Sequence, residues 1–586
     1  MSWKRKDNDV LLPMVIPYFC NPYIMIVRYL RIFYLSMSGK IKFFSLSLLC
    51  GMQFLGLAAQ KDNKPAVPRL VVGIVVNNLR SDLLNRYWDS FEQNGFRRLV
   101  NEGTRFDYMQ LNYFYTQTAP GMATLVSGCY PSAHGIVANE WYDQLSGKIV
   151  AATGDNDTYC VGCENTNEKH SPKNLLTSTI GDELRLAFFK QSKVFAVSLD
   201  AMPAVLLGGH MANAVYWLDN YSGKIISSSA YLPELPQWVK DFNGKKLPDI
   251  YLQQTWSLLK PDSVYQRLNF PDNSRYENGI KGKKVFPYDL KTLSVRTDGG
   301  RDYYLLKNTP MGNNLVKDFA ITLIVNEELG KDDYPDLLLI NFNATEYIGQ
   351  QYGLLSYEMH DALLRLDKEL AHFLSFIDSY LGKSNVLCFL TSPHGASYPY
   401  KAMQEWGMPA GQFNAGQAYV LLKSYLKALY GEGEWIKFWK GQQIYLNHQL
   451  LQQSKIDKEQ MQREIARFLL DFNGIGYVIT SGQILQNGSF NGLHRQLANS
   501  FYLTRSGDVM YALLPNWSEM GESLAVHNTG YAYDSQVPLI FYGWRTDRAS
   551  IIRPIDVQDL AASLAAVLKI PFPNACHGNI IPELVK

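Results

Sequence analysis

The chain has 586 residues, with 56 Lys and Arg against 54 Asp and Glu, so its formal net charge is +2 and no basic surface for nucleic acid is expected. Hydrophobic residues make up 47% of the chain and charged residues 19%, a balance that excludes a disordered or fibrous protein. A chain of this length can bury a large core, either in one domain with insertions or in two domains.

The N-terminal region has the pattern of a targeting segment. From Met37 a short basic stretch precedes an apolar run that extends from Phe43 to about Ala59, with small residues before Gln60. This run is shorter than the ~20 residues of a membrane-spanning helix. We therefore predict a signal peptide at 37–59 and an upstream extension at 1–36 that is wrongly assigned to the chain, since translation is expected to begin at Met37. The alternative is a genuine N-terminal anchor.

The charge is distributed unevenly between this segment and the rest. Residues 1–59 carry seven basic and two acidic side chains, a local charge of +5. Taking these from the totals leaves 49 basic and 52 acidic residues in 60–586, a net charge of −3. The mature protein is therefore expected to be mildly acidic.

Beyond the signal segment, continuous apolar runs alternate with helical patterns. The runs predict strands buried on both faces of a parallel sheet, at 69–76, 193–199, 336–342, 385–390 and 537–542. Helices are predicted after the N-cap Ser356 and over Asp556–Leu568. This alternation predicts a layered α/β fold with a mostly parallel central sheet, whose reactive groups lie beyond the carboxyl ends of the strands.

Two stretches interrupt the alternation and are predicted to be insertions that cover the active edge of the sheet. One, near 205–310, is rich in Trp, Tyr, Pro, Asn and Lys, and the other, near 396–500, is dominated by Gln-rich amphipathic helix. Cys160 and Cys163 are spaced to close a loop disulfide in an exported protein, or they remain two free thiols.

Polar residues follow the predicted strands. Asn77 comes after the first, and Thr118 lies near a helix N-terminus because Pro120 suits a first helical turn. A hydroxyl at that position faces unpaired backbone N–H groups, which favour an anion. Further along, Glu346 and Gln350 follow one strand and His394 another, and His527 precedes the last. The alternatives are that Thr118 is an ordinary helix N-cap, and that His394 and His527 are interior histidines without a catalytic role.

Several sequence blocks carry a family resemblance over nearly the whole of 60–586. They are RLVVGIVVNNLRSD, TAPGMATLVSGCYPSAHGIVANEWYD, HSPKNLL, TPMGN, LLRLDKELA and YAYDSQVPLIFYGW. In these blocks the chain resembles the alkaline phosphatase superfamily, and is most similar to the bacterial phosphate-irrepressible alkaline phosphatases, which are related to the nucleotide pyrophosphatase/phosphodiesterases. The resemblance implies the alkaline-phosphatase-like fold. The predicted signal peptide implies a protein of the bacterial envelope that is periplasmic or otherwise exported.

The resemblance also implies a metal-dependent reaction. In this family two zinc ions about 4 Å apart activate a Thr or Ser nucleophile and clamp the leaving oxygen of a phosphate ester. Thr118 stands at the nucleophile position, and Asn139 matches an Asn that contacts phosphate oxygens. The first metal site corresponds to Glu346, Gln350 and His527, and the second to Asn77, His394 and Pro393 together with Thr118.

Several of these positions depart from the family pattern. Asn77 and Pro393 replace metal-binding Asp residues, and Gln350 replaces a His. Asp200 and Met202 replace the Lys and Arg that hold the transferring phosphoryl group. Zinc prefers carboxylate, imidazole or thiolate ligands. Without a second zinc ion Thr118 stays a weak nucleophile.

These departures predict a catalytically degenerate phosphatase, a pseudoenzyme with reduced or absent metal. Its expected role is to bind a small phosphate-ester-like ligand or a partner protein of the envelope, and no nucleic acid. The alternative is an active metal-dependent phosphomonoesterase or phosphodiesterase that uses Thr118 as nucleophile with an altered metal site.

Overall fold

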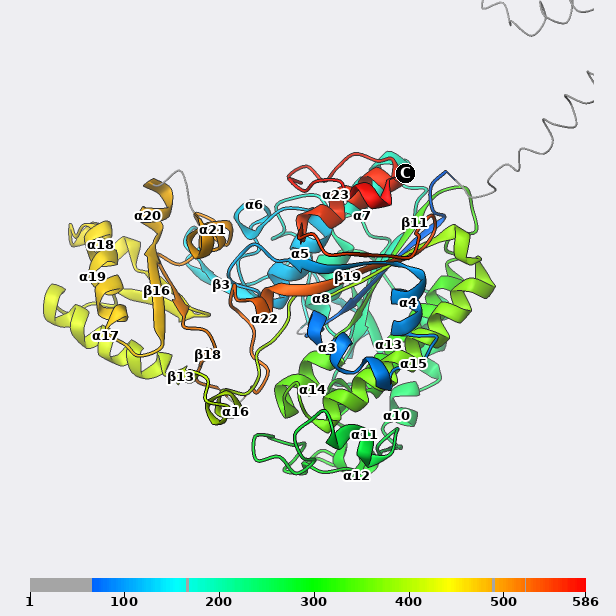
Figure 1. Ribbon diagram of the computed structural model, residues 1–586. Coiled ribbons are helices and arrows are strands. Elements are labelled where there is room, and N and C mark those ends of the chain that lie inside the picture. Colours follow the sequence, from blue (N-terminus) through cyan, green and yellow to red (C-terminus); the bar gives the residue numbers. More distant parts are fainter. Residues whose placement is uncertain (1–65, 165–167, 487–490, 522, 586) are drawn as a thin grey trace, which may run out of the picture. The chain divides into compact units, whose positions relative to one another are not determined.

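The computed structural model describes residues 66–164, 168–486, 491–521 and 523–585. Residues 64–586 form one compact unit (Figure 1). The extension predicted at 1–36 and the signal peptide predicted at 37–59 lie outside the described residues. Within the described residues no helix combines the length and the apolar character needed to span a bilayer.

The unit is built on an 11-stranded sheet whose central strands are parallel. The strands run in the order β20-β2-β19-β12-β1-β11-β6-β7-β8-β5, with β21 paired to β2. Their bounds are β1 Leu70–Val76, β2 Thr104–Gln110, β5 Cys160–Val161, β6 Val194–Val197, β7 Ala214–Leu218, β8 Ile225–Ser228, β11 Asp336–Phe342, β12 Val386–Thr391, β19 Gln536–Gly543, β20 Ala549–Ile551 and β21 Ile555–Asp556. This confirms the predicted fold class.

One predicted strand runs the other way. β1 is parallel to β11 and β12, and β11 is parallel to β6. β19, predicted at 537–542 as another parallel strand, is antiparallel to both β12 and β2. An apolar run reports burial and not direction, so the sequence pattern could not separate the two orientations.

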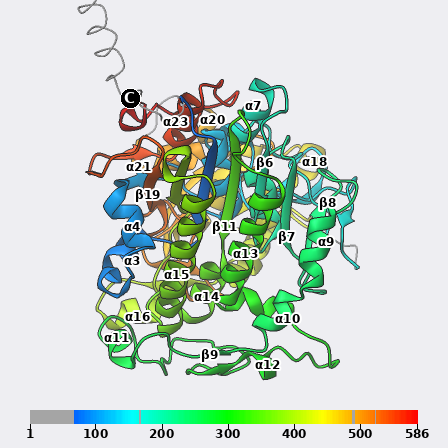
Figure 2. The same ribbon diagram turned by 90° about the vertical axis from the view of Figure 1, so that its right-hand side faces the viewer.

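Helices cover both faces of the sheet (Figures 1 and 2). Alternate residues of β1 point to opposite faces, so Val72 and Ile74 join one core and Val71 and Val75 the other. The first core includes α13 Met311–Asn326 and α15 Tyr357–Tyr380. The second includes α5 Thr118–Ser127, α7 Ile180–Ala187, α8 Ala201–Gly208 and α23 Gln558–Leu568. The helix predicted over Asp556–Leu568 is α23.

A second sheet lies within and just beyond the stretch near 396–500. Its antiparallel order is β14-β15-β17-β16, formed by Ile436–Lys440, Gln443–Leu446, Val509–Leu513 and Ile475–Thr480. α17 Ala415–Tyr430 and α19 Lys458–Leu470 bury their apolar residues against it. The sequence pattern indicated the helices and missed these strands.

The stretch near 205–310 begins with β7 and β8, which extend the main sheet. The rest of it forms short elements: α9 Gln237–Gly244, α10 Leu247–Tyr251, α11 Asp262–Gln266, α12 Leu290–Leu293 and the pair β9 Thr255–Trp256 and β10 Tyr288–Asp289. Cys160 and Cys163 are joined by a disulfide.

The remaining α-helices and strands are short. They are α3 Ser81–Arg86, α4 Phe96–Glu102, α6 Pro131–His134, β3 Glu140–Asp143, β4 Lys148–Ala151, α14 Ala344–Tyr352, α16 Tyr400–Glu405, β13 Gly411–Phe413, α18 His448–Gln453, α20 Ser481–Gln486, α21 Gly492–Asn499, β18 Trp517–Glu519 and α22 Ala532–Ser535.

Candidate active site

The predicted site residues gather at the carboxyl edge of the central strands. Asn77 directly follows β1, Glu346 lies in the first turn of α14 after β11, and His394 follows β12. Thr118 is the first residue of α5, and His527 comes from the loop between β18 and α22. Because neighbouring parallel strands end at one edge of a sheet, residues far apart in sequence meet there.

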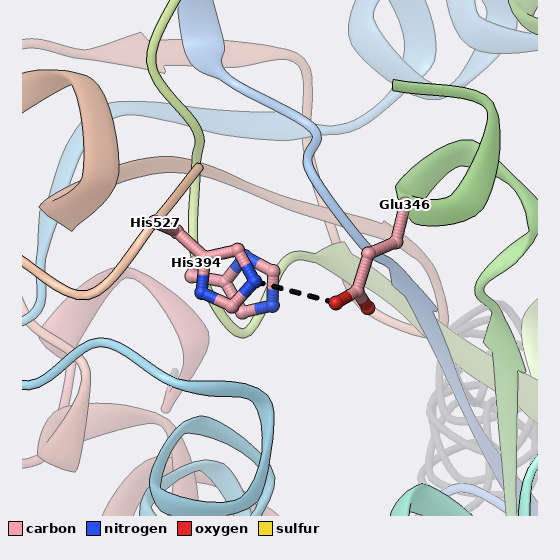
Figure 3. Close-up of side chains that lie close together, drawn as sticks. All are labelled: Glu346, His394 and His527. Atoms are coloured by element: carbon pink, nitrogen blue, oxygen red, sulfur yellow. Dashed lines mark hydrogen bonds and ion pairs between the residues drawn. The ribbon is translucent and has the colours of Figure 1, made fainter. Parts of the chain in front are cut away.

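Three of these residues form a cluster that can hold a metal ion. One ligand atom each from Glu346, His394 and His527 lies within 4.8 Å of the other two. Glu346 Oε1 is 3.3 Å from His527 Nε2, and the imidazole rings stack with centroids 3.6 Å apart. Figure 3 shows the carboxylate facing the stacked rings. The resemblance assigns Glu346 and His527 to one metal site and His394 to a neighbouring one, and the structure places ligand atoms of all three close together.

Backbone contacts orient both imidazole rings. His394 Nδ1 lies 2.9 Å from the Gly395 carbonyl oxygen, and His527 Nδ1 lies 2.8 Å from that of Thr116. Each Nδ1 therefore donates its hydrogen to a carbonyl, which directs Nε2 toward the cluster. Histidines that bind metals are held in this way.

Charge is distributed unevenly among the three residues of the cluster. Burial alone would raise the pKa of Glu346, but the hydrogen bond with His527 and the charges of both histidines lower it to about 2. Burial lowers the pKa of His394 to about 3. Burial also acts to lower the pKa of His527, but its hydrogen bond with Glu346 and that residue's charge outweigh burial and raise it. An ionised Glu346–His527 pair thus lies beside a neutral imidazole.

Thr118 lies against this cluster. Its hydroxyl donates to Glu346 Oε1 over 3.3 Å, and its Oγ1 is 3.1 Å from His394 Nε2. The side chain is buried but lines a cavity of about 400 Å³. The predicted nucleophile is therefore placed where a bound group can reach it.

The two amides at altered positions turn their nitrogens toward Glu346. Asn77 Nδ2 donates to Glu346 Oε2 over 2.6 Å, and Gln350 Nε2 donates to Oε1 over 3.2 Å. The oxygen of Asn77 accepts from Asn341 over 2.7 Å. In this network both amides donate hydrogen bonds to the Glu346 carboxylate.

Pro393 packs against Gly121 of α5. A Cβ added to Gly121 would lie 2.4 Å from the Pro393 carbonyl oxygen. Gly121 therefore allows α5 to approach the loop after β12 closely enough for Thr118 to contact His394.

Asp200 sits in a polar network inside the 400 Å³ cavity. It forms an ion pair with the buried Lys307, and its Oδ2 accepts from Asn343 over 2.6 Å and from Tyr347 over 2.8 Å. Met202 lines the same cavity. The sequence pattern did not indicate Lys307, although it lies two residues before Thr309, the first residue of the TPMGN block.

A second cavity also borders the cluster. It has a volume of about 460 Å³ and is lined by His527 and by Lys440 from the second sheet. Asn139 and Gln350 line both cavities. Asn139 is held at the start of α5, because its Oδ1 accepts a hydrogen bond from the Ala119 N–H over 2.9 Å.

Sequence comparison assigns the family. The model of the type I phosphodiesterase / nucleotide pyrophosphatase family matches residues 71–531. The chain belongs to this family. All of the site residues described above fall within the matched residues.

Relatives along the whole chain include bacterial phosphatases. The chain is 34% identical over 540 residues to alkaline phosphatase PafA of Elizabethkingia meningoseptica, covering 90% of this chain and 96% of that protein. It is also 34% identical to a Myroides odoratus protein named calcium-transporting ATPase. This match extends over 547 residues and covers 92% of this chain and 98% of that protein. The crystal structure of wild-type PafA matches with a TM-score of 0.84 at 33% identity, covering 89% of this chain and 100% of that one.

Proposed function

We propose that this protein is a metal-dependent phosphoric ester hydrolase that uses Thr118 as nucleophile beside a site for one metal ion. The observation that carries the proposal is the cluster of Glu346, His394 and His527 in contact with the Thr118 hydroxyl. The similarity to alkaline phosphatase PafA supports it. This is the alternative that the sequence left open, and not the degenerate phosphatase that it favoured.

The donor set fits one ion and does not fit the two of the family pattern. A carboxylate and two imidazoles are a known ligand set for catalytic zinc. A second set would need Asn77, Gln350 or Pro393, but both amides donate to Glu346 and Pro393 has no side-chain donor. When bound, a single ion supplies Lewis-acid polarisation and lowers the pKa of a coordinated oxygen.

The residues of the chain position the substrate around Thr118. The hydrogen bond to Glu346 fixes the hydroxyl at the wall of the 400 Å³ cavity, and Asn139 places its amide where the two cavities meet. The ion pair with Asp200 offsets the charge of Lys307. The cavity therefore offers little net positive charge to balance a dianionic phosphomonoester. The two cavities together suit the two substituents of a phosphodiester.

The decisive experiment compares metal content and hydrolysis in one preparation. Bis-p-nitrophenyl phosphate and p-nitrophenyl phosphate are assayed with the zinc-loaded protein and with Thr118→Ala. We expect close to one zinc per chain, faster hydrolysis of the diester, and loss of activity by at least about a hundredfold in the variant. Thr124→Ala is the matched control, because Thr124 lies in the same helix and bonds to Pro120 and His134.

A second candidate is the degenerate phosphatase, which binds a phosphate-ester-like ligand or an envelope partner without turning it over. The amides of Asn77 and Gln350 favour it, because they already satisfy the Glu346 carboxylate without a metal ion. Absence of hydrolysis and of bound zinc in the same experiment would favour this candidate and exclude the hydrolase. In both cases we propose that the protein is exported, which N-terminal sequencing of the native protein tests.

A further inference from the structure

Asp534 lies on α22, in the segment of chain that follows His527, and it is fully buried. Its Oδ2 accepts one hydrogen bond from the Thr529 N–H over 3.0 Å and another from the Thr529 hydroxyl over 2.6 Å. Its Oδ1 has no hydrogen-bond partner within the part of the chain that the structure describes. The carboxylate is therefore directed at Thr529, which lies two positions after His527.

Thr116 connects Thr529 to the His527 ring. The Thr116 hydroxyl donates to the Thr529 carbonyl oxygen over 2.8 Å and accepts from the Thr529 N–H over 3.1 Å. The carbonyl oxygen of Thr116 accepts from His527 Nδ1 over 2.8 Å. A displacement of Thr529 would therefore also displace the group that orients the His527 ring.

The backbone of Asp534 reaches the other histidine. Its carbonyl oxygen accepts from the Gly395 N–H over 2.7 Å, and the Gly395 carbonyl oxygen accepts from His394 Nδ1 over 2.9 Å. The chain segments approach closely here, since a Cβ added to Gly395 would lie 2.1 Å from the Tyr533 carbonyl oxygen. Asp534 is thus connected to one imidazole ring through its side chain and to the other through its backbone.

We propose that Asp534 is a positioning residue that keeps the imidazole rings of His394 and His527 together at one site. The rings stack with centroids 3.6 Å apart although they come from different loops, as Figure 3 shows. Without the carboxylate, the buried Thr529 hydroxyl would lose its acceptor, which favours a shift of the His527 loop toward water. The inference rests on the proposed function only for what the two rings bind.

A carboxylate that only stabilises the fold is the alternative, and Asp367 is the matched control for it. Asp367 on α15 is also fully buried, and its carboxylate accepts from the backbone N–H groups of Glu92 over 2.7 Å and Phe96 over 2.6 Å. These partners lie at or just before the start of α4, outside the active site. Asp367→Ala should therefore lower the Tm and leave both histidine rings in place.

Histidine NMR of the metal-free, full-length protein is the first measurement. Samples are labelled at histidine ¹³Cε1, and the variants His394→Gln and His527→Gln assign the two signals. Stacked rings shield each other's protons, so the parent signals should lie upfield of those of an exposed histidine. Asp534→Ala should move them downfield. Asp534→Asn keeps an accepting oxygen and should restore the parent positions, and Asp367→Ala should not change them.

Zinc affinity, measured by titration calorimetry, is the second measurement. Groups that orient metal-binding histidines typically contribute 10- to 100-fold to metal affinity. We therefore expect Asp534→Ala to weaken zinc binding by at least about tenfold, and Asp534→Asn and Asp367→Ala to retain the parent affinity. Thr529→Val is tested in parallel in case Asp534→Ala does not fold. It removes only the hydroxyl that donates to Oδ2, and it should shift the histidine signals in the same direction.

The two measurements separate this proposal from the proposed function. Unchanged histidine signals in Asp534→Ala and Thr529→Val, together with a loss of Tm like that of Asp367→Ala, would overturn the positioning role. Histidine signals that move in Asp534→Ala, in a protein that binds no zinc, would support the positioning role and contradict the metal site of the proposed function.

Discussion

At the scale of single residues, the proposed preference for a phosphodiester depends on how charge is placed in the 400 Å³ cavity. Lys307 is 3% exposed at its side chain and Asp200 is 24% exposed, so their ion pair is shielded from salt. The pair places a cation where the family resemblance expects a Lys and an Arg, but Asp200 neutralises it. Substituting Asp200 should therefore release a positive charge into the cavity.

We predict that Asp200→Asn increases the affinity for inorganic phosphate about tenfold, which corresponds to ~1.4 kcal/mol. The amide keeps the size of the side chain and removes its charge, so Lys307 attracts the dianion. Isothermal titration calorimetry measures the change. Tyr347→Phe is the control, because it removes one hydrogen bond to Asp200 and leaves the ion pair intact. Equal phosphate affinity in Asp200→Asn and the parent would show that Lys307 does not face the bound anion.

At the scale of elements, the site depends on how closely α5 meets the loop after β12. Gly121 lies one turn after Thr118 and faces the Pro393 carbonyl oxygen. A side chain there would separate the helix from the loop and move Thr118 away from His394. The small residue is therefore needed for the site as well as for packing.

We predict that Gly121→Ala costs about 1–3 kcal/mol of unfolding free energy through overpacking and weakens phosphate binding or hydrolysis. Chemical denaturation measures the free energy of unfolding, and isothermal titration calorimetry measures phosphate binding. Gly416→Ala is the matched control in α17, where an added Cβ would meet only Asn414 Oδ1 at 3.5 Å. That substitution should leave stability unchanged or raise it by about 0.4–1 kcal/mol. A Gly121→Ala variant as stable as the parent would contradict the close approach.

Local patterns predict elements better than they predict contacts between distant residues. The apolar run 336–342 coincides with β11, because a strand buried on both faces needs apolar residues throughout. The strands of the second sheet were missed, since the amphipathic helices beside them gave the stronger periodic signal. Lys307 and Asp200 are far apart in sequence, so no local pattern could pair them. The same limit applies to the cluster at Glu346, which brings together the first turn of α14 and two separate loops.

At the scale of the whole molecule, residues 64–586 contain the sheet, its two helical layers and the site in one compact unit. The whole basic excess of the chain comes from the preceding segment, because residues 60–586 carry a net charge of −3. The complete sequence has a net charge of +2 and an isoelectric point near 8.0. Residues 37–59 contain only Lys40 and Lys42 as charged residues, so three possible N-termini give three different charges.

We predict that the native protein begins near Gln60 and focuses below neutral pH. A chain from Met1 carries +2, an uncleaved chain from Met37 carries −1, and a chain from Gln60 carries −3. Isoelectric focusing combined with intact mass distinguishes the three, because each differs in both charge and length. Replacing Ala59 by Arg should block cleavage, since signal peptidase requires small residues at its site, and should return the charge and mass of the uncleaved chain. A native protein with the mass of the full sequence and a basic isoelectric point would instead identify residues 1–59 as a retained N-terminal anchor.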